Sequence, residues 1–209
     1  MNLIGIDFSI NKPAACIFSN NTYHFISWPY GLNPEIVETF KNSGVKIVDR
    51  TDVKVEHKNI SEKMRYEIEN AEYLSNLIIS SLKNFINNNT YLAFEGLSYA
   101  SSGDVVLQLS GYKYILMLKL KEYIPLNHMF TYSPITIKSV AECSKRGMTK
   151  FDMIEKFINS DIDNEFKNNL KNYREKFQTI RSKKWIIHID DLVDSFWTLE
   201  TLRKKELFK

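Results

Sequence analysis

The stretch Asn2-Leu3-Ile4-Gly5-Ile6-Asp7-Phe8-Ser9 brings an apolar run up to a single carboxylate near the start of the chain. Leu3 to Ile6 are apolar without alternation and include two β-branched residues, which predicts a short strand buried on both faces. Asp7 follows at the strand's end, where a desolvated carboxylate needs a cation or hydrogen-bond donors. The alternative for Asp7 is a structural role, because it also precedes the turn that reaches Pro13.

The composition is that of an ordinary globular protein. With 209 residues, of which 44% are hydrophobic and 25% charged, the chain can form one domain with a substantial core, and neither disorder nor a fibrous class is indicated. A net charge of +3 and a pI near 8.7 permit nucleic-acid binding without requiring it. Basic residues gather between Phe166 and Ile187, where seven Lys and Arg residues stand against one acid.

Cysteine usage and hydropathy bear on the cellular compartment. Cys16 and Cys143 have neither a CxxC pairing nor a nearby His cluster, so neither a zinc site nor a disulfide framework is predicted. No apolar run approaches the ~18 residues of a membrane span. A signal pattern is also missing, because the first apolar run ends at Asp7. We therefore expect a soluble cytoplasmic protein without a membrane partner.

The order of elements predicts the fold class. Five strands are expected, at residues 3–6, 14–18, 22–28, 91–94 and 129–132. Helices are expected at residues 61–86, 104–122, 135–158 with a break at 145–147, 164–180 as a basic arm, and from 190 onward. This order indicates an α/β fold with a mixed five-stranded sheet, three antiparallel strands and then parallel ones, flanked by helices.

Two segments are interpreted as insertions in a single domain that spans residues 1–209. They cover about residues 29–60, with a short helix at 34–41 and a possible strand at 45–48, and about residues 160–187. The helix at 104–122 is apolar nearly all round, so we expect one face to pack on the sheet and another on a partner subunit.

Carboxylates stand where parallel strands would bring them together. Glu95 ends the strand at 91–94 as Asp7 ends the first one, and parallel strands place their carboxyl ends at one edge of the sheet. On the C-terminal helix Asp191 and Asp194 share a face, although Asp190 and Asp191 also suit helix capping. Clustered carboxylates repel unless a divalent cation neutralises them, and all-oxygen ligands favour Mg²⁺ or Mn²⁺.

Several motifs together resemble a known family. The pattern IGIDFS (4–9), YLAFEGLSYA (91–100) and DDLVDSFWTL (190–199), with YSPITIK (132–138) and KRGMTK (145–150) between, resembles the RuvC-type Holliday-junction resolvases of the ribonuclease H-like superfamily, particularly viral and phage members. The resemblance covers residues 2–28, 61–159 and the final helix. A viral member would act in the cytoplasm of the host cell.

The resemblance implies the site residues. The metal-binding catalytic acids would be Asp7, Glu95, Asp191 and Asp194, with Asp190 as the register alternative for Asp191. His188, one turn earlier, could touch the site or lie on the surface.

The resemblance also implies DNA contacts. Lys138, Lys145 and Lys150 correspond to phosphate-binding lysines, with Arg146 beside them, and a lysine point charge positions phosphate without reading sequence. Lys113 stands where the family often has Arg. Tyr99 is the nearest candidate for the family's aromatic wedge, one residue after the expected position.

The implied reaction is two-metal hydrolysis of a four-way DNA junction, with one ion activating water and the other stabilising the leaving 3′ oxygen. Two symmetric cuts imply a homodimer. The alternatives are a ribonuclease H-fold nuclease for RNA–DNA hybrids or other branched DNA, a junction-binding module without catalysis, and an actin-like nucleotide binder. The last would need Gly at the turn where Ser9-Ile10-Asn11 stands.

Overall fold

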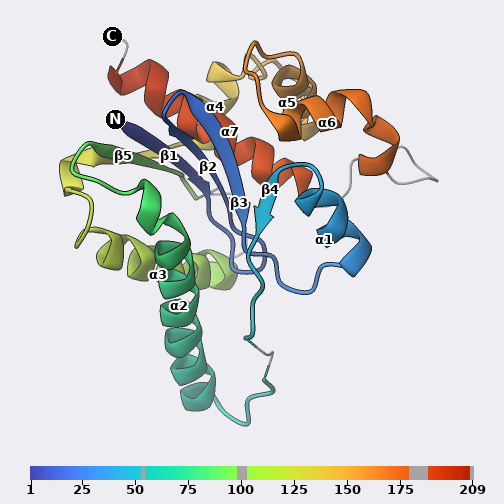
Figure 1. Cartoon of the computed structure of the whole chain (residues 1–209). Coiled ribbons are helices and arrows are strands. Elements are labelled where there is room, and N and C mark those ends of the chain that lie inside the picture. Colours follow the sequence, from blue (N-terminus) through green and yellow to red (C-terminus); the bar gives the residue numbers. More distant parts are fainter. Residues whose placement is uncertain (53–54, 98–102, 179–187, 208–209) are drawn as a thin grey trace.

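A central sheet organises the chain in a computed structural model, which describes residues 1–52, 55–97, 103–178 and 188–207. Within these residues the sheet has six strands in the order β4-β3-β2-β1-β5-β6 (Figure 1). The strands are β1 (Asn2–Asp7), β2 (Ala14–Ser19), β3 (Thr22–Ser27), β4 (Val45–Ile47), β5 (Thr90–Glu95) and β6 (Met129–Tyr132).

Strand directions confirm the predicted mixed sheet. The β1–β2 and β2–β3 pairs are antiparallel, whereas β1–β5 and β5–β6 are parallel. The possible strand at 45–48 is confirmed as β4, which pairs in parallel with β3, with Val45 opposite Phe25 and Ile47 opposite Ser27. The described sheet therefore has six strands where five were predicted. Three residues interrupted by one Lys give too short a pattern to distinguish an edge strand from a loop.

Helices cover both sides of the sheet. One side carries α2 (Ile60–Leu82) and α3 (Gly103–Leu120). The other side carries α4 (Pro134–Val140), α5 (Lys150–Ile158), α6 (Glu165–Asn172) and α7 (Ile189–Leu202), while α1 (Pro34–Lys41) leads into β4. The predicted break within 135–158 is confirmed, since a loop separates α4 from α5 and a capping box of Thr149 and Asp152 begins α5.

Strand β1 supplies side chains to both cores, as its continuous apolar run predicts. Leu3 packs with α5, α6 and α7 on one side, whereas Ile4 and Ile6 pack with α2 and α3 on the other, and all three are fully buried.

None of the described helices combines the length and apolar character that a membrane span requires.

Helix α7 lies unusually close to β1. A Cβ atom added at Gly5 would lie 2.3 Å from the carbonyl oxygen of Ser195 and 2.4 Å from the amide nitrogen of Leu199. Only a residue without a side chain permits this approach. The contact places the N-terminal half of α7 over the carboxyl end of β1.

The two segments that were interpreted as insertions pack against each other. Phe40 of α1 has ring contacts with Phe166 of α6 and with Phe177, at centroid distances of 6.3 Å in both cases. All three rings are buried. In its described part, the basic arm is therefore anchored in the core through its apolar side, while Lys171 and Lys176 remain exposed.

Candidate active site

Three carboxylates from three elements meet at one edge of the sheet. Asp7 ends β1, Glu95 ends the parallel neighbour β5, and Asp194 lies on α7. One carboxylate oxygen from each of the three lies within 4.8 Å of the others. An all-oxygen set at this spacing could hold a divalent metal ion. The topology thus brings together residues from the first, middle and last thirds of the chain.

Burial and mutual repulsion shift the pKa values of these acids upward. The pKa of Asp7 is raised by burial and by the charges of Asp194, Glu95 and Asp191. Burial and the charge of Asp194 raise the pKa of Glu95 to about 7. The pKa of Asp194 is also raised, first by burial. Raised carboxyl pKa values indicate that the cluster needs more positive charge than the protein supplies.

Lys150 supplies part of that positive charge. Its Nζ lies 3.1 Å from Oδ2 of Asp194 and 3.0 Å from Oδ2 of Asp190. Burial alone would lower the pKa of Lys150, but Asp194 and Asp190 together raise it. Conversely, burial would raise the pKa of Asp190, and the nearby Lys150 ammonium lowers it. Lys150 therefore stays charged at the mouth of the acid cluster.

Asp191 lies beside the three-acid group and is held by His188. Nδ1 of His188 and Oδ2 of Asp191 are 2.8 Å apart, and an ionised carboxylate can only accept, so the ring nitrogen donates. The charge of Asp191 contributes to the raised pKa of Asp7. Asp190, the register alternative, instead pairs with Lys150 and accepts a hydrogen bond from the backbone N–H of His188 at 3.3 Å.

The alternative that His188 lies on the surface is wrong. The residue is completely buried, and its Nε2 is hydrogen-bonded to Oγ of Ser27 at the end of β3. The ring packs edge-on against Phe40 at a centroid distance of 5.8 Å. His188 also has a φ of 99°, a left-handed conformation that costs free energy for a residue with a side chain. Both ring nitrogens are thus used to connect the sheet to Asp191.

Lys113 is buried beneath the site. Its Nζ donates to the carbonyl oxygen of Glu95 at 2.6 Å and lies 5.2 Å from the centre of the Phe94 ring. Burial lowers the pKa of Lys113 to about 8, although the charge of Glu95 opposes the shift. In this position Lys113 supports the end of β5, and a role toward DNA remains a prediction.

The other predicted DNA contacts lie apart from the acids or outside the described residues. Lys138 is half-buried on α4, and Lys145 and Arg146 are exposed in the loop before α5. Tyr99 and its neighbour Ser98 fall outside the described residues. Among the predicted basic contacts, Lys150 forms ion pairs with carboxylates of α7, at the distances given above.

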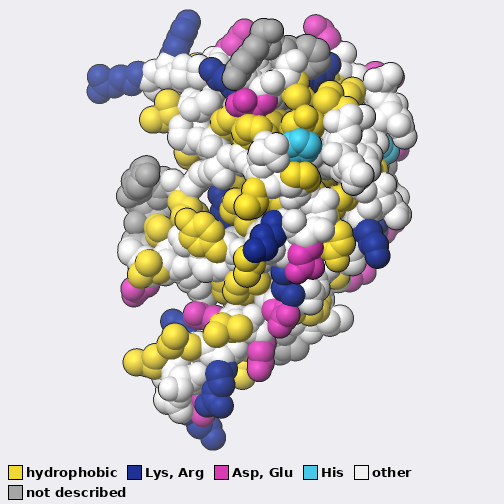
Figure 2. All heavy atoms as spheres, turned by 90° about the vertical axis from the view of Figure 1, so that its left-hand side faces the viewer, with side chains coloured by type: hydrophobic (Ala, Val, Ile, Leu, Met, Phe, Trp, Pro, Cys, Tyr) yellow, Lys and Arg dark blue, Asp and Glu magenta, His cyan; other side chains and the backbone are white. Residues whose placement is uncertain are grey.

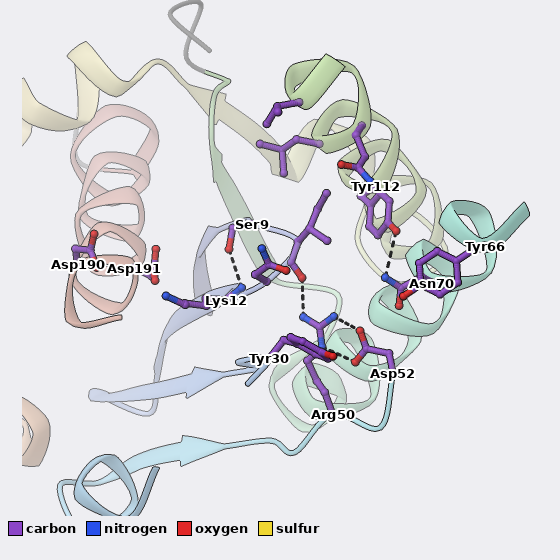
Figure 3. Close-up of a pocket in the computed structure, with 15 residues that line it drawn as sticks. Ser9, Lys12, Tyr30, Arg50, Asp52, Tyr66, Asn70, Tyr112, Asp190 and Asp191 are labelled. Atoms are coloured by element: carbon purple, nitrogen blue, oxygen red, sulfur yellow. Dashed lines mark hydrogen bonds and ion pairs between the residues drawn. The ribbon is translucent and has the colours of Figure 1, made fainter. Parts of the chain in front are cut away.

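A groove of about 650 Å³ borders the site (Figure 3). It runs from Asp190 and Asp191, past the turn between β1 and β2, to the facing sides of α2 and α3. Sequence reasoning did not find it, because its lining comes from separate segments, including residues 50–52 in a supposed insertion. In the sequence, Arg50 is one charged residue in a polar stretch, and hydrophobic periodicity does not indicate that such a residue is buried.

Comparisons with known proteins bear on the fold. No protein-family model matches the chain, and no curated protein does. Thermus thermophilus RuvC matches with a TM-score of 0.52 and 10% identity, covering 98% of this chain and 96% of that chain. The same protein in complex with a Holliday junction substrate gives a TM-score of 0.49 at 10% identity, covering 98% of this chain and 95% of that chain.

The yeast mitochondrial Holliday junction resolvase Ydc2 gives a TM-score of 0.48 at 14% identity, covering 99% of this chain and 82% of that chain. The match to Thermus thermophilus RuvC shows that the chain has the RuvC fold, which the sequence resemblance predicted. The ribonuclease H-like fold class is thereby confirmed.

Proposed function

We propose that the protein is a structure-selective endonuclease that cleaves four-way DNA junctions by metal-assisted hydrolysis. The observation that carries the proposal is the meeting of Asp7, Glu95 and Asp194 within 4.8 Å at one sheet edge. Asp7 and Glu95 lie at the carboxyl ends of β1 and β5, where α/β sheets form their sites. The RuvC fold supports a nuclease over an actin-like nucleotide binder.

The donor set fits a divalent cation. The three nearest ligands are all carboxylate oxygens, and their raised pKa values reflect unneutralised negative charge. Asp7, Glu95 and Asp194 would hold Mg²⁺, for which Mn²⁺ can substitute, with Asp191 beside them as the ligand of a second ion. When bound, a pair of divalent ions would supply activation of the attacking water and charge stabilisation for the leaving oxygen.

The protein's own residues then have separate roles. His188 orients the Asp191 carboxylate, and Lys113 supports the strand end that carries Glu95. Lys150 can exchange its carboxylate partners for a backbone phosphate when metal neutralises the acids. Lys138, Lys145 and Arg146 would contact phosphates further along the DNA, and Tyr99 would serve as the aromatic wedge.

The proposal includes a homodimer of single-domain subunits, because a four-way junction requires two symmetric cuts. What supports it is the outer surface of α2 and α3, where hydrophobic side chains reach the surface (Figure 2). The exposed fraction is 71% for Leu107 and 58% for Leu118 on α3, and 58% for Met64 on α2. Exposed apolar side chains that gather on one face are common at protein interfaces.

The test uses labelled four-way junction, linear duplex and RNA–DNA hybrid, each with Mg²⁺ and with EDTA. We expect the junction alone to be cut, and only with Mg²⁺. Asp7→Asn removes one anionic ligand, so several kcal/mol of transition-state stabilisation should be lost, which is roughly a 10³-fold slower reaction. The control Asp161→Asn makes the same change at an exposed site and should cut normally.

If the protein cuts the RNA–DNA hybrid in preference to the junction, the hybrid is its substrate and the junction is not. Junction binding that is equal in EDTA and never leads to cleavage would indicate a binding module instead.

A further inference from the structure

The groove beside the acids has polar groups at its far end that the proposed catalytic site does not use. Its near end is formed by Asp190 and Asp191, and its far end by Asn70 of α2 and Tyr112 of α3 (Figure 3). Its volume of about 650 Å³ is within the ~300–1,000 Å³ of small-molecule sites. A DNA strand whose phosphate lies at the acids would therefore have this space next to it.

The wall of the groove is rigid because Arg50 is held by several hydrogen bonds. Its side chain is 2% exposed, pairs with both carboxylate oxygens of Asp52, and donates to the carbonyl oxygen of Ile10 at 2.6 Å. Its guanidinium carbon also lies 5.6 Å from the centre of the Tyr30 ring. With a further bond from Nη1 to the carbonyl oxygen of Trp28, four of the five N–H donors of Arg50 are engaged, and these bonds hold the turn after β1 in place.

Asn70, which lines this groove, carries a buried polar atom without a hydrogen-bond partner in the described part of the chain. The residue is 8% exposed, its Nδ2 donates to Oη of Tyr112 at 3.2 Å, and its Oδ1 has no partner among the described residues. A buried amide oxygen without a partner destabilises the structure that holds it. Because Tyr112 accepts the bond from Asn70, its own hydroxyl hydrogen remains available as a donor. An acceptor and a donor thus stand side by side.

We propose that this end of the groove binds an unpaired nucleobase of the DNA strand that the acids hold. The inference rests on the proposed function and adds a base-binding site to it. Every nucleobase carries an adjacent donor and acceptor on its edge, which matches Oδ1 of Asn70 and the hydroxyl of Tyr112. The ring of Tyr66, which also lines the groove, offers a surface for stacking.

A four-way junction suits this site energetically. Extruding a base from a duplex costs a few kcal/mol, and least where pairing is already weakened, as at a crossover. Binding such a base would satisfy the orphan oxygen of Asn70 and add favourable stacking on an aromatic ring. Linear duplex offers no such base, so the site would add to the selectivity for branched DNA.

The experiment is a double-mutant cycle between the DNA and Asn70, with binding as the readout. Junctions carrying one abasic nucleotide, at each position around the cut in turn, are titrated with the Asp7→Asn protein and with the Asp7→Asn, Asn70→Ala protein. We expect one abasic position to weaken binding by Asp7→Asn roughly tenfold, and Asn70→Ala to remove that sensitivity. Tyr112→Phe, which removes only the hydroxyl, should reduce the sensitivity partly.

The matched control is Asn76→Ala, the same substitution at an exposed position of α2, and it should keep the full abasic penalty. Thermal unfolding of each variant shows that the fold is retained. The base site would be overturned if Asn70→Ala kept the full abasic penalty at every position, or if no abasic position weakened binding by the Asp7→Asn protein. Either result would leave the proposed junction cleavage standing. Failure of the Asp7→Asn protein to bind any junction would instead overturn the proposed function, and the base site with it.

Discussion

The two sides of the sheet use similarly apolar helices in opposite ways. Helix α7 buries 11 of its 14 residues, whereas α3 buries only 4 of its 18. The α7 side is closed by an aromatic cluster that includes Phe157, Phe166 and Phe196. The α2 and α3 side leaves apolar side chains and a groove exposed to solvent. The closed side places the acids rigidly, and the open side carries the proposed contacts with partners.

The largest expected effect is loss of packing on the closed side. Phe196 is 1% exposed and contacts the rings of Phe157 and Trp197 at centroid distances of 4.9 Å. Phe196→Ala should lower the free energy of unfolding by about 3–5 kcal/mol, whereas Leu118→Ala on the open side should change it by less than about 0.5 kcal/mol. Urea denaturation of both variants measures the contrast. Equal losses would show that the two sides are equally packed.

A second prediction concerns the negative charge of the buried carboxylates, which α7 on the closed side holds close together. Because the pKa of Glu95 is raised from 4.5 to about 7, the folded state binds more protons than the unfolded state between these values. Stability of the metal-free protein should therefore fall as the pH rises from about 4.5 to about 7, by on the order of 2 kcal/mol. The raised pKa values of Asp7 and Asp194 act in the same direction.

Denaturation in EDTA across this pH range measures the fall. Glu95→Gln should flatten the slope, and millimolar Mg²⁺ should restore stability at neutral pH because it binds the ionised acids. A slope that Glu95→Gln leaves unchanged would assign the effect to other groups.

The third prediction concerns the link between the closed side and the acids. His188→Asn removes the bridge from Ser27 to Asp191 and should weaken Mn²⁺ binding about 10- to 100-fold, as loss of a group that orients a metal ligand commonly does. Calorimetric titration without DNA measures it. Ser27→Ala should give a smaller loss in the same direction. Unchanged Mn²⁺ affinity in His188→Asn would mean that the histidine serves packing alone.

The smallest effect on folding should come from a charge on the open side. Leu118 is 58% exposed, so Leu118→Glu should change the free energy of unfolding by less than about 0.5 kcal/mol, yet it should dissociate the proposed dimer. Sedimentation equilibrium detects the change in mass. Ile135→Glu, at an exposed apolar position on α4, is the control and should remain dimeric. A dimer that survives Leu118→Glu would place the interface elsewhere.

Periodicity and order predicted most of the fold, because long apolar runs and helical spacing are local signals. They also predicted that Asp7 and Glu95 would meet, since parallel neighbouring strands end at one edge. The edge strand β4 was predicted only as a possible strand, because three residues are too few to show a hydrophobic periodicity. The meeting of Asp194 with Asp7 followed from helix placement and family resemblance together.

Residues that act through distant contacts were outside the reach of the sequence. His188 is bound to Ser27 across 161 positions, and nothing in the local sequence indicates that pairing. In the sequence, Asn70 is an ordinary polar residue of an amphipathic helix. Its proposed role depends on its hydrogen bond to Tyr112 on another helix, which the sequence does not show. Such residues are defined by tertiary packing, which single-sequence patterns do not contain.

The close approach of α7 to β1 at Gly5 also affects when the acid cluster forms. Positions 5 and 195 are separated by 190 residues, and their contact is what seats Asp194 beside Asp7. A growing polypeptide that has not yet released α7 from the ribosome has Asp7 and Glu95 but lacks the third acid. The three-acid cluster is thus complete only after α7 has been translated and has docked on β1.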